Sequence, residues 1–432
     1  MTGSPEPRRP MRAFYILSAV IFLQFLAGGT AMPFLALYAE SLGASLIQIS
    51  WIVGSASLVG LGASPAWGWI ADRVGRRKPF LVGAIGTLVV TTFLAANAPW
   101  WLMSASGSCD GPCLWTVLAP SGTGVWWVLL PLKVVEAIAQ GAYAVGNLAM
   151  MGDILEGHPH RARMMGAYRM SGSLAFAVAI VIAGLVSQTS GFRTTYTVAS
   201  AIYFASLLFS LALPEARRAT AARRAGSAER VSYVKLLRGP MLALVVVATV
   251  YQLPFSAVYS IWSVWVAEGL ALGRAVYSQL WGLAAFVEVP AMLIAGYLGD
   301  RYGRRLPFMV GMSLFAVVYL LYIVVPTTAV PLVVGLAGAQ VIRGFALAFF
   351  TASAMTMAIE IPAPEARGRA SGLYQFSQSF AGIVGNYSGG FIAQTFGYQT
   401  LFAFAAAIVA LGATYVRLAI GRPARPGVEV PG

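Results

Sequence analysis

Long apolar runs alternate with short charged clusters along the chain. Five of these runs contain no Asp, Glu, Lys or Arg, and each is long enough for one or two membrane-crossing helices of about 20 residues. Backbone groups in lipid must be hydrogen-bonded within the protein, so the runs are expected to be helices. Divided at charge clusters, Gly and Pro turns and aromatic pairs, the sequence predicts about twelve spans: 13–38, 46–70, 80–104, 124–151, 164–188, 195–213, 239–266, 276–298, 307–325, 332–359, 371–394 and 400–418.

Composition supports the same interpretation. The 432 residues are 58% hydrophobic and only 10% charged, whereas about a quarter of the residues in a soluble domain are charged. The predicted fold class is therefore an all-α integral membrane protein. The first span is too long for the core of a signal peptide and lacks a small-residue cleavage site, so we expect it to be retained.

Two stretches of the sequence recur. The string GWIADRVGRRKPF, which begins at Gly68, follows the second expected span, and GYLGDRYGRRLPF, which begins at Gly296, follows the eighth. Residues 163–194 also align without a gap with 369–400. A duplicated six-helix unit produces this pattern, and transporters built that way bind substrate between the halves near the membrane midplane. The expected organisation is an amino-terminal tail (1–12), a six-helix bundle (13–213), a basic cytoplasmic linker (214–238), a second bundle (239–418) and a carboxyl-terminal tail (419–432).

The net charge of +14 is distributed unevenly. Most Lys and Arg residues fall in the amino terminus, in the loops that lead from even to odd spans and in the carboxyl terminus, while Arg193 and Arg274 fall on the opposite side. Positive residues accumulate in cytoplasmic loops, so both termini are expected in the cytoplasm of a cell-membrane protein. The basic excess reflects orientation, and we expect no nucleic-acid partner.

These residues resemble the major facilitator superfamily (MFS). The G-x-x-x-D-R-x-G-R-R string is similar to that family's signature loop between helices two and three, and a weaker copy between helices eight and nine is also typical of it. The resemblance implies two pseudo-symmetric six-helix bundles and a loop that latches the bundles on the cytoplasmic side. It assigns the latch to Gly68, Asp72, Gly75 and Arg76, with Asp300 and Arg304 in the second copy.

The branch within that family stays open. Drug–proton antiporters usually carry Gly-Pro-x-x-Gly-Gly in span five, but residues 179–184 read AIVIAG, and the span-four Arg-x-x-x-Gly pattern is replaced by Lys133 with Ala137. The segments around span eight and span eleven are more similar to the sugar-efflux and lactose-permease-like branches.

Five charged residues remain inside the expected spans. Lys133 and Arg169 lie near span ends and are expected to extend their charged groups to the interface. Three lie deeper, where a charge costs several kcal/mol: Glu136, Glu288 and Arg343. The repeat places Glu136 opposite Arg343, and the deep charges have either a structural role, as ion pairs, or a role in coupling or substrate binding.

Span four carries a polar stripe on one helical face, formed by Glu136, Gln140, Tyr143 and Asn147. It either lines a cavity or bonds a neighbouring helix, and the family resemblance favours the cavity. Span seven carries an aromatic stripe that is either packing or cavity wall, and further polar candidates lie in spans one, ten and eleven. These additional cavity candidates are Tyr251, Tyr259, Trp262, Gln24, Gln340, Tyr374 and Gln378.

A proton carried at midplane depth needs a carboxylate, because both histidines lie in a cytoplasmic loop. Glu136 has Lys133 nearby on the same helix and is expected to stay ionised in a pair, whereas Glu288 has no basic neighbour in its own span. We therefore rank Glu288 before Glu136 as the proton carrier.

The predicted function is secondary transport of a small organic solute by alternating access, coupled to protons, with export of sugars or amphiphilic compounds as one form of it. The chain contains no phosphate-binding G-x-x-x-x-G-K-S/T string, so we expect no ATP, and we expect no cofactor, no metal and a monomer. A receptor or sensor on the same scaffold is the alternative, and a membrane enzyme is disfavoured because no catalytic constellation is present. Cys109 and Cys113 lie in an outer loop, either as a disulfide or as free thiols.

Overall fold

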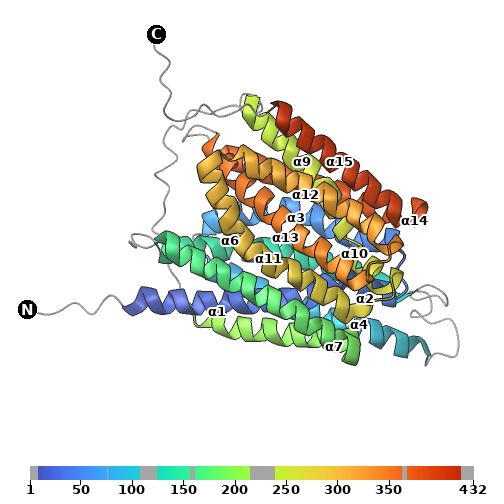
Figure 1. Ribbon diagram of the computed structural model, residues 1–432. Coiled ribbons are helices and arrows are strands. Elements are labelled where there is room, and N and C mark those ends of the chain that lie inside the picture. Colours follow the sequence, from blue (N-terminus) through green and yellow to red (C-terminus); the bar gives the residue numbers. More distant parts are fainter. Residues whose placement is uncertain are drawn as a thin grey trace, which may run out of the picture. The chain divides into compact units, whose positions relative to one another are not determined.

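A computed structural model of the protein describes residues 8–74, 76–107, 124–155, 161–214, 239–361 and 367–419, and these residues form helices, turns and no strand (Figure 1). Cys109 and Cys113 lie outside the described residues, and the side chain of Arg169 is not described. The expected all-α fold is confirmed, with helical elements α1 (Arg8–Ala31), η1 (Met32–Phe34), α2 (Leu35–Ser41), α3 (Leu46–Val74), α4 (Lys78–Gly107), η2 (Val125–Val128), α6 (Leu129–Ile154), α7 (Arg161–Leu211), α9 (Gly239–Tyr259), α10 (Trp262–Val264), η3 (Trp265–Gly269), α11 (Gly273–Tyr302), α12 (Arg305–Val324), η4 (Val325–Thr327), α13 (Leu332–Glu360), α14 (Arg367–Phe396) and α15 (Tyr398–Ala419).

The helices account for the twelve expected spans. Within the described part of the chain, ten helical segments are long and apolar enough to cross a membrane, and one of them, Met170–Leu211, contains two spans. These two spans meet at Gly191, whose φ of 77° interrupts α7. Gly397, its aligned counterpart in the repeat, has a φ of 87° between α14 and α15. Only glycine adopts this backbone region at little cost, so both halves of the repeat turn at equivalent glycines. The remaining span is α14, which carries three glutamines and one asparagine.

Spans one and seven are broken, which the apolar pattern did not predict. In span one a 3₁₀ turn that contains Pro33 separates α1 from α2. In span seven α9 ends at Tyr259, and α10 and the π-helix η3 follow. Met32 and Ser260 are separated by the same number of residues as Gly68 and Gly296, which begin the two charged strings. The two interruptions therefore occupy equivalent places in the repeat. Proline removes one backbone donor and bends a helix, which accounts for the first interruption.

Residue contacts divide the chain into two units, which are described separately. Unit 1 comprises Met1–Gly226, Tyr259–Gly282 and Asn386–Gln394, and unit 2 comprises Ser227–Val258, Leu283–Gly385 and Thr395–Gly432. Unit 1 thus combines the helices of the first predicted half with the α10–α11 region and the last part of α14.

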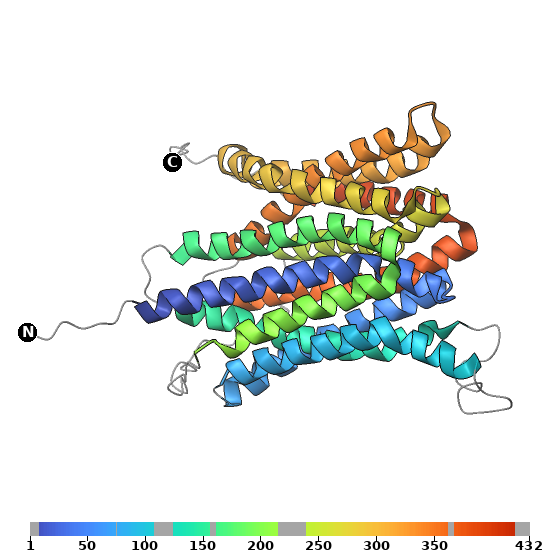
Figure 2. The same cartoon turned by 90° about the horizontal axis from the view of Figure 1, so that it is seen from below.

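In unit 1, α1 lies beside both arms of α7 (Figures 1 and 2). The approach is closest at Gly29, where an added Cβ would lie 2.9 Å from both the Ala179 Cβ and the Phe176 carbonyl oxygen. In unit 2, Gly385 of α14 meets α9 in the same way, since an added Cβ would overlap the Leu253 carbonyl oxygen and lie 2.9 Å from the Ser256 Cβ. The alignment of 163–194 with 369–400 pairs Ala179 with Gly385, so the two contacts are equivalent in the repeat. In each half, the first and fifth spans therefore pack together at a glycine.

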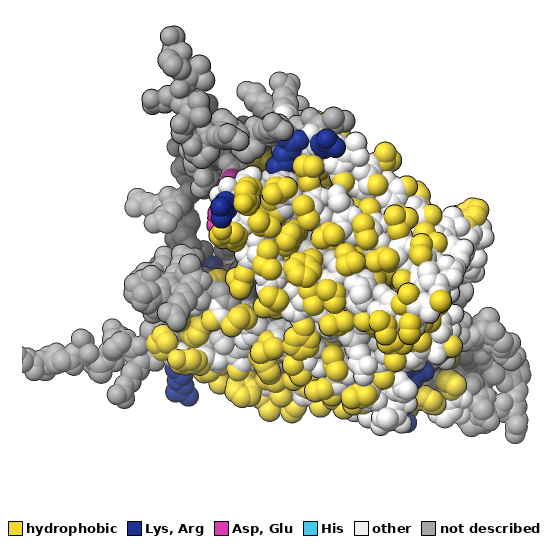
Figure 3. Space-filling model, in the orientation of Figure 1, with side chains coloured by type: hydrophobic (Ala, Val, Ile, Leu, Met, Phe, Trp, Pro, Cys, Tyr) yellow, Lys and Arg dark blue, Asp and Glu magenta, His cyan; other side chains and the backbone are white. Residues whose placement is uncertain are grey.

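Hydrophobic side chains cover most of the face shown in Figure 3, with Lys and Arg at its margins. Large exposed apolar residues recur along the helices, for example Leu293 on α11 and Leu411 on α15. Exposed apolar area on this scale indicates contact with lipid. The chain is therefore a multi-pass membrane protein.

Candidate functional site

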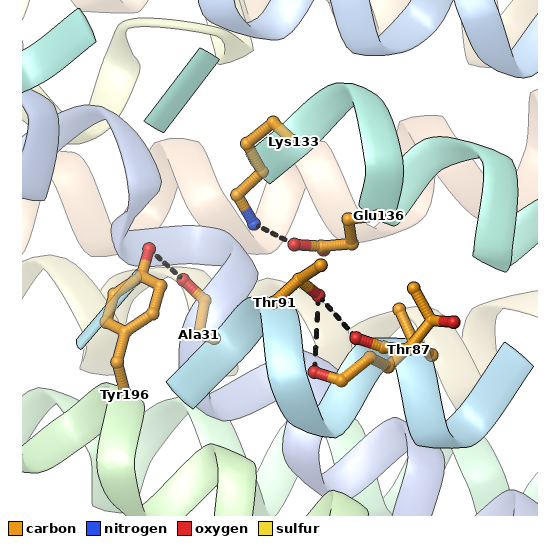
Figure 4. Close-up of polar contacts among 7 residues, drawn as sticks. Ala31, Thr87, Thr91, Lys133, Glu136 and Tyr196 are labelled. Carbon is orange, nitrogen blue, oxygen red and sulfur yellow. Dashed lines mark hydrogen bonds and ion pairs between the residues drawn. The ribbon is translucent and has the colours of Figure 1, made fainter. Parts of the chain in front are cut away.

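A buried ion pair lies within α6 of unit 1. The Lys133 Nζ is 2.7 Å from the Glu136 Oε2, and the two side chains are 7% and 18% exposed (Figure 4). Residues three apart on a helix share one face, which makes the pair possible. The prediction that Lys133 extends to the interface was wrong, because its ammonium group is buried against the carboxylate of Glu136. The prediction that Lys133 and Glu136 form a pair is confirmed.

Tyrosines of α7 surround this pair. The charge of Glu136 acts on the hydroxyls of Tyr196 and Tyr203, and the Gln140 side chain also lies close enough to act on the Tyr203 hydroxyl. Tyr196 also donates a hydrogen bond of 3.1 Å to the Ala31 carbonyl oxygen, next to the break in span one (Figure 4). The pair therefore lies near the face of α7 that contacts the end of α1.

Two further residues of the polar stripe on α6, Tyr143 and Asn147, are buried. The Tyr168 hydroxyl donates a 2.6 Å hydrogen bond to the Asn147 Oδ1. Tyr143 is 7% exposed, and Gln24 on α1 is 5% exposed. Neither the Tyr143 hydroxyl nor the Gln24 Nε2 has a hydrogen-bond partner among the described residues. A buried polar group without a partner costs about 1–3 kcal/mol, so both groups are suited to bonding a ligand or water.

The sequence did not identify the α7 tyrosines. Tyr196 and Tyr203 are two helical turns apart, a spacing that places both on one helical face, and this could have indicated a polar surface. Tyr203 lies in an apolar stretch that resembles a lipid-facing segment, and Tyr196 follows Arg193 and two threonines near a span end. Only the packing of α7 against α1 and α4 shows that this face points inward.

The aromatic stripe predicted for span seven does not form a single surface. In unit 2, Tyr251 packs against Phe350 with ring centroids 3.6 Å apart and against Phe315 at 5.0 Å. In unit 1, beyond the break, Tyr259 and Trp262 pack with residues of α11. The interruption of span seven divides the stripe between two aromatic clusters.

The other intramembrane charges lie in unit 2. The charge of Arg343 on α13 acts on the Glu288 carboxyl on α11. The two helices approach closely beside this pair, since a Cβ at Gly344 would lie 2.7 Å from the Ala284 carbonyl oxygen. Glu288 thus has a cationic neighbour after all, although on a different helix.

The remaining polar candidates of unit 2 hydrogen-bond tyrosines. Gln340 is fully buried and donates a 2.8 Å bond to the Tyr322 hydroxyl, while its Oε1 has no partner among the described residues. Gln378 donates a 2.8 Å bond to the Tyr374 hydroxyl on the same helix.

The second copy of the charged string forms an ion-pair network at the ends of α11 and α13. The Arg304 Nη1 lies 2.8 Å from the Asp300 Oδ1, and the Arg304 Nη2 lies 3.3 Å from the Glu360 Oε1. Burial disfavours the charged guanidinium, but the hydrogen bonds and charges of Glu360 and Asp300 outweigh this and raise the pKa of Arg304 above its ordinary value. The sequence identified Asp300 and Arg304 but not Glu360, which lies two helices further along the chain.

The first copy is described less fully. Gly75 lies outside the described residues, the Asp72 side chain is not described, and Arg76 is exposed. A Cβ at Gly68 would meet no atom of the described residues within 4 Å, so no helix lies against Gly68. The neighbouring Trp67 makes the contact with α6 instead, donating a 3.0 Å hydrogen bond to the Ile138 carbonyl oxygen.

Comparisons with known proteins agree with this architecture. The model of the MFS_1 like family matches residues 14–404. The chain is similar to the multidrug resistance protein MdtG of Klebsiella pneumoniae, with 25% identity over 93% of this chain and 92% of the relative. It is also similar to MdtG of Proteus mirabilis, with 23% identity over 98% of this chain and 100% of the relative.

Solved structures with the same fold include the nucleoside transporter NupG, with a TM-score of 0.74 at 16% identity, covering 95% of this chain and 99% of NupG. A bacterial homolog of the human lysosomal transporter Spinster has a TM-score of 0.70 at 12% identity, covering 96% of this chain and 98% of that protein.

Proposed function

Because the chain belongs to the MFS_1 like family, and is a secondary transporter rather than an enzyme, we propose that it exports amphiphilic organic compounds in exchange for protons. The observation that carries this proposal is a set of buried polar side chains in unit 1. It comprises the Lys133–Glu136 ion pair and two groups without a hydrogen-bond partner among the described residues, the Tyr143 hydroxyl and the Gln24 Nε2. Polar groups inside a membrane protein are costly and serve solute or ion pathways.

Amphiphilic compounds fit this group chemically. The Tyr143 hydroxyl and Gln24 amide can bond a polar substituent, and the phenol rings of Tyr196 and Tyr203 offer apolar faces to the rest of the molecule. Lys133 and Glu136 together carry no net charge, which disfavours a multiply charged anion. The relatives named multidrug resistance proteins support the same substrate class.

We assign proton coupling to Glu288, as the sequence ranking did, but for a different reason. Lys133 and Glu136 lie on one helix, so a rigid movement of helices does not separate them. Glu288 and Arg343 lie on different helices, and a change in their separation alters how strongly Arg343 favours the ionised carboxyl. Such a pair can release a proton in one access state and take one up in the other.

We further propose that the protein works without ATP as a monomer in the cell membrane, with both termini in the cytoplasm. The uneven distribution of Lys and Arg supports this orientation. A receptor on the same scaffold would bind such compounds without moving them, so solute flux in vesicles separates the two functions.

The test is accumulation of a fluorescent amphiphilic cation such as ethidium in cells that lack their own exporters. Expression of the protein should lower accumulation, and Glu136→Gln should abolish that effect when accumulation is normalised to the amount of protein in the membrane. Glu268→Gln, a change at an exposed carboxylate of η3, is the matched control and should retain export. Equal accumulation with and without the protein, for a panel of such compounds, contradicts the assignment.

A further inference from the structure

The arm of α7 that follows its interruption is hydrogen-bonded to α4 at two depths. Arg193 donates two bonds of 3.1 Å, from its Nε and its Nη2, to the Asn97 Oδ1. Asn97 is 6% exposed, and its Nδ2 donates a 3.0 Å bond to the Phe93 carbonyl oxygen, which fixes the orientation of the amide. Two helical turns further along α7, the Ser200 hydroxyl donates a 2.9 Å bond to the Val89 carbonyl oxygen. These bonds hold the two helices in one register.

The same face of this arm carries the two tyrosines that lie near Glu136. Four polar residues at spacings of three, four and three share the face: Arg193, Tyr196, Ser200 and Tyr203. The Tyr196 hydroxyl donates its bond to the last residue of α1 (Figure 4). The Tyr203 hydroxyl lies about one turn lower, where it would be 3.7 Å from a Cβ added at Gly28. The two bonds to α4 therefore act on the helix face that presents both tyrosines.

The second half of the repeat offers an internal comparison. When the alignment of 163–194 with 369–400 is continued along α7 and α15, the four polar residues correspond to Gln399, Phe402, Ala406 and Val409. The last three are buried, and α15 packs against α12 as α7 packs against α4. The serine has become Ala406, which has no hydroxyl to donate. The third and sixth spans of a six-helix unit thus pack together without these polar bonds.

A different contact between the same spans is present in both halves. Lys78 donates a 2.7 Å bond to the Leu211 carbonyl oxygen at the end of α7. Arg305 bonds the Arg417 carbonyl oxygen near the end of α15, and the continued alignment pairs Leu211 with Arg417. A basic group at the last carbonyls stabilises the end of a helix. The shared contact serves the fold of both halves, whereas the bonds made by the upper part of α7 belong to the half that contains the buried ion pair.

The position of Arg193 is itself unusual. It lies at the end of its span opposite the charged strings, where the chain carries few basic residues. Lys and Arg are disfavoured on that side of a membrane. A basic residue kept there, with both donors directed at one buried amide, indicates a specific role.

We propose that Arg193 and Ser200 are positioning residues for the polar site of unit 1, which is the Lys133–Glu136 pair with its two neighbouring tyrosines. Their bonds to α4 fix the rotation of this arm of α7 about its own axis, so that both tyrosine hydroxyls face the pair. A shift of one residue position turns a helix by about 100° and would direct the hydroxyls elsewhere. This inference rests on the proposed function, because the site that it orients is the proposed substrate site.

The first experiment measures the position of Tyr196 without a substrate. A fluorotyrosine is incorporated at this position by suppression of a stop codon, and fluorine NMR spectra are recorded for the protein in nanodiscs. Ser200→Ala and Arg193→Gln each remove bonds to α4. We expect the population of a displaced signal, relative to that of the original signal, to rise about threefold to tenfold in each variant, as the loss of a hydrogen bond predicts.

The matched control is Thr197→Val, which removes a hydroxyl from the same arm of α7. Thr197 is exposed, and its hydroxyl bonds only the Arg193 carbonyl oxygen within its own helix. The control should leave the fluorine spectrum unchanged, and the melting temperature of each variant is measured alongside. An equal change in Thr197→Val, or unchanged spectra in folded Ser200→Ala and Arg193→Gln, overturns the proposal.

A pair of variants at Asn97 tests the arginine contact by conservative rescue. Asn97→Leu removes the acceptor for the guanidinium and should displace the fluorine signal as Arg193→Gln does. Asn97→Asp keeps an acceptor oxygen opposite Arg193 and adds a favourable charge, so it should retain the original spectrum. If Asn97→Asp gives the same spectrum as Asn97→Leu, the contact has no part in positioning this arm.

The second experiment connects the position of the tyrosines to transport. In vesicles, Ser200→Ala should raise the KM for ethidium about threefold to tenfold and change kcat by less than about twofold, because a misplaced site loses substrate binding. Thr197→Val should keep the original KM. The NMR result needs no substrate, so it tests the positioning even if the proposed substrate class is wrong. A displaced fluorine signal with an unchanged KM would contradict the proposed substrate site, whereas an undisplaced signal contradicts the positioning itself.

Discussion

Replacing either member of the Lys133–Glu136 pair should destabilise the protein far more than replacing both. The side chains are 7% and 18% exposed, so Glu136→Gln leaves a buried ammonium group and Lys133→Met leaves a buried carboxylate. Removing one partner of a buried pair costs about 3–5 kcal/mol, and we expect about 3 kcal/mol for each single change, since Glu136 keeps some exposure. Replacing both by apolar residues is often neutral or stabilising, so Lys133→Met with Glu136→Leu should cost less than about 1 kcal/mol.

The assay is thermal unfolding of the purified protein in one detergent, with the four proteins of the double-mutant cycle compared. Each single variant should lower the melting temperature by several degrees, and the double variant should recover most of that loss. The double variant should nevertheless fail to export, because it lacks the two charged groups that we propose take part in substrate binding. Melting temperatures that fall additively in the double variant would refute the reasoning, since additivity means that the two charges do not interact.

Further changes follow from the structure and the sequence. Gly29→Ala should lower stability by about 1–3 kcal/mol in thermal unfolding, because the added Cβ would overpack the contact with α7, whereas Gly338→Ala should not. Asp72→Asn should slow solute flux in vesicles but leave folding unchanged, since one charge at a helix end contributes about 1 kcal/mol or less; wild-type flux would remove Asp72 from the latch. Glu360→Gln should change stability by less than about 1 kcal/mol, since its ion pair with Arg304 is partly exposed, and a larger loss would mean that the network holds the helix ends together. A disulfide between Cys109 and Cys113 should block thiol labelling from outside until a reductant is added, and immediate labelling of either residue would mean free thiols.

The spans were predictable because a long apolar run in lipid must form a helix to pair its backbone groups. The charged strings marked where these helices end. The apolar pattern did not predict the breaks in spans one and seven. Pro33 marks the first break in the sequence, whereas no proline adjoins Ser260 at the second. Tyr277 of α11 donates a 2.7 Å hydrogen bond to the Pro33 carbonyl oxygen within the first break. Such a long-range contact has no signature within either segment.

The polar site was predictable in part. The spacing of Lys133 and Glu136 fixes their proximity on one helix, so that pair followed from sequence. The contribution of Tyr196 and Tyr203 depends on how α7 packs, and the effect of Arg343 on Glu288 depends on how α11 and α13 approach.

The most direct test of the account is gradient-driven transport by Glu288→Gln in reconstituted vesicles, with Glu268→Gln as the control. The substitution removes the proton-binding group and leaves a polar side chain of similar size. We expect accumulation of substrate against its gradient to vanish when a pH gradient is imposed, while exchange of labelled for unlabelled substrate continues at a rate near that of the wild type. Uphill transport by Glu288→Gln at the wild-type rate would contradict the assignment of Glu288 as the coupling residue.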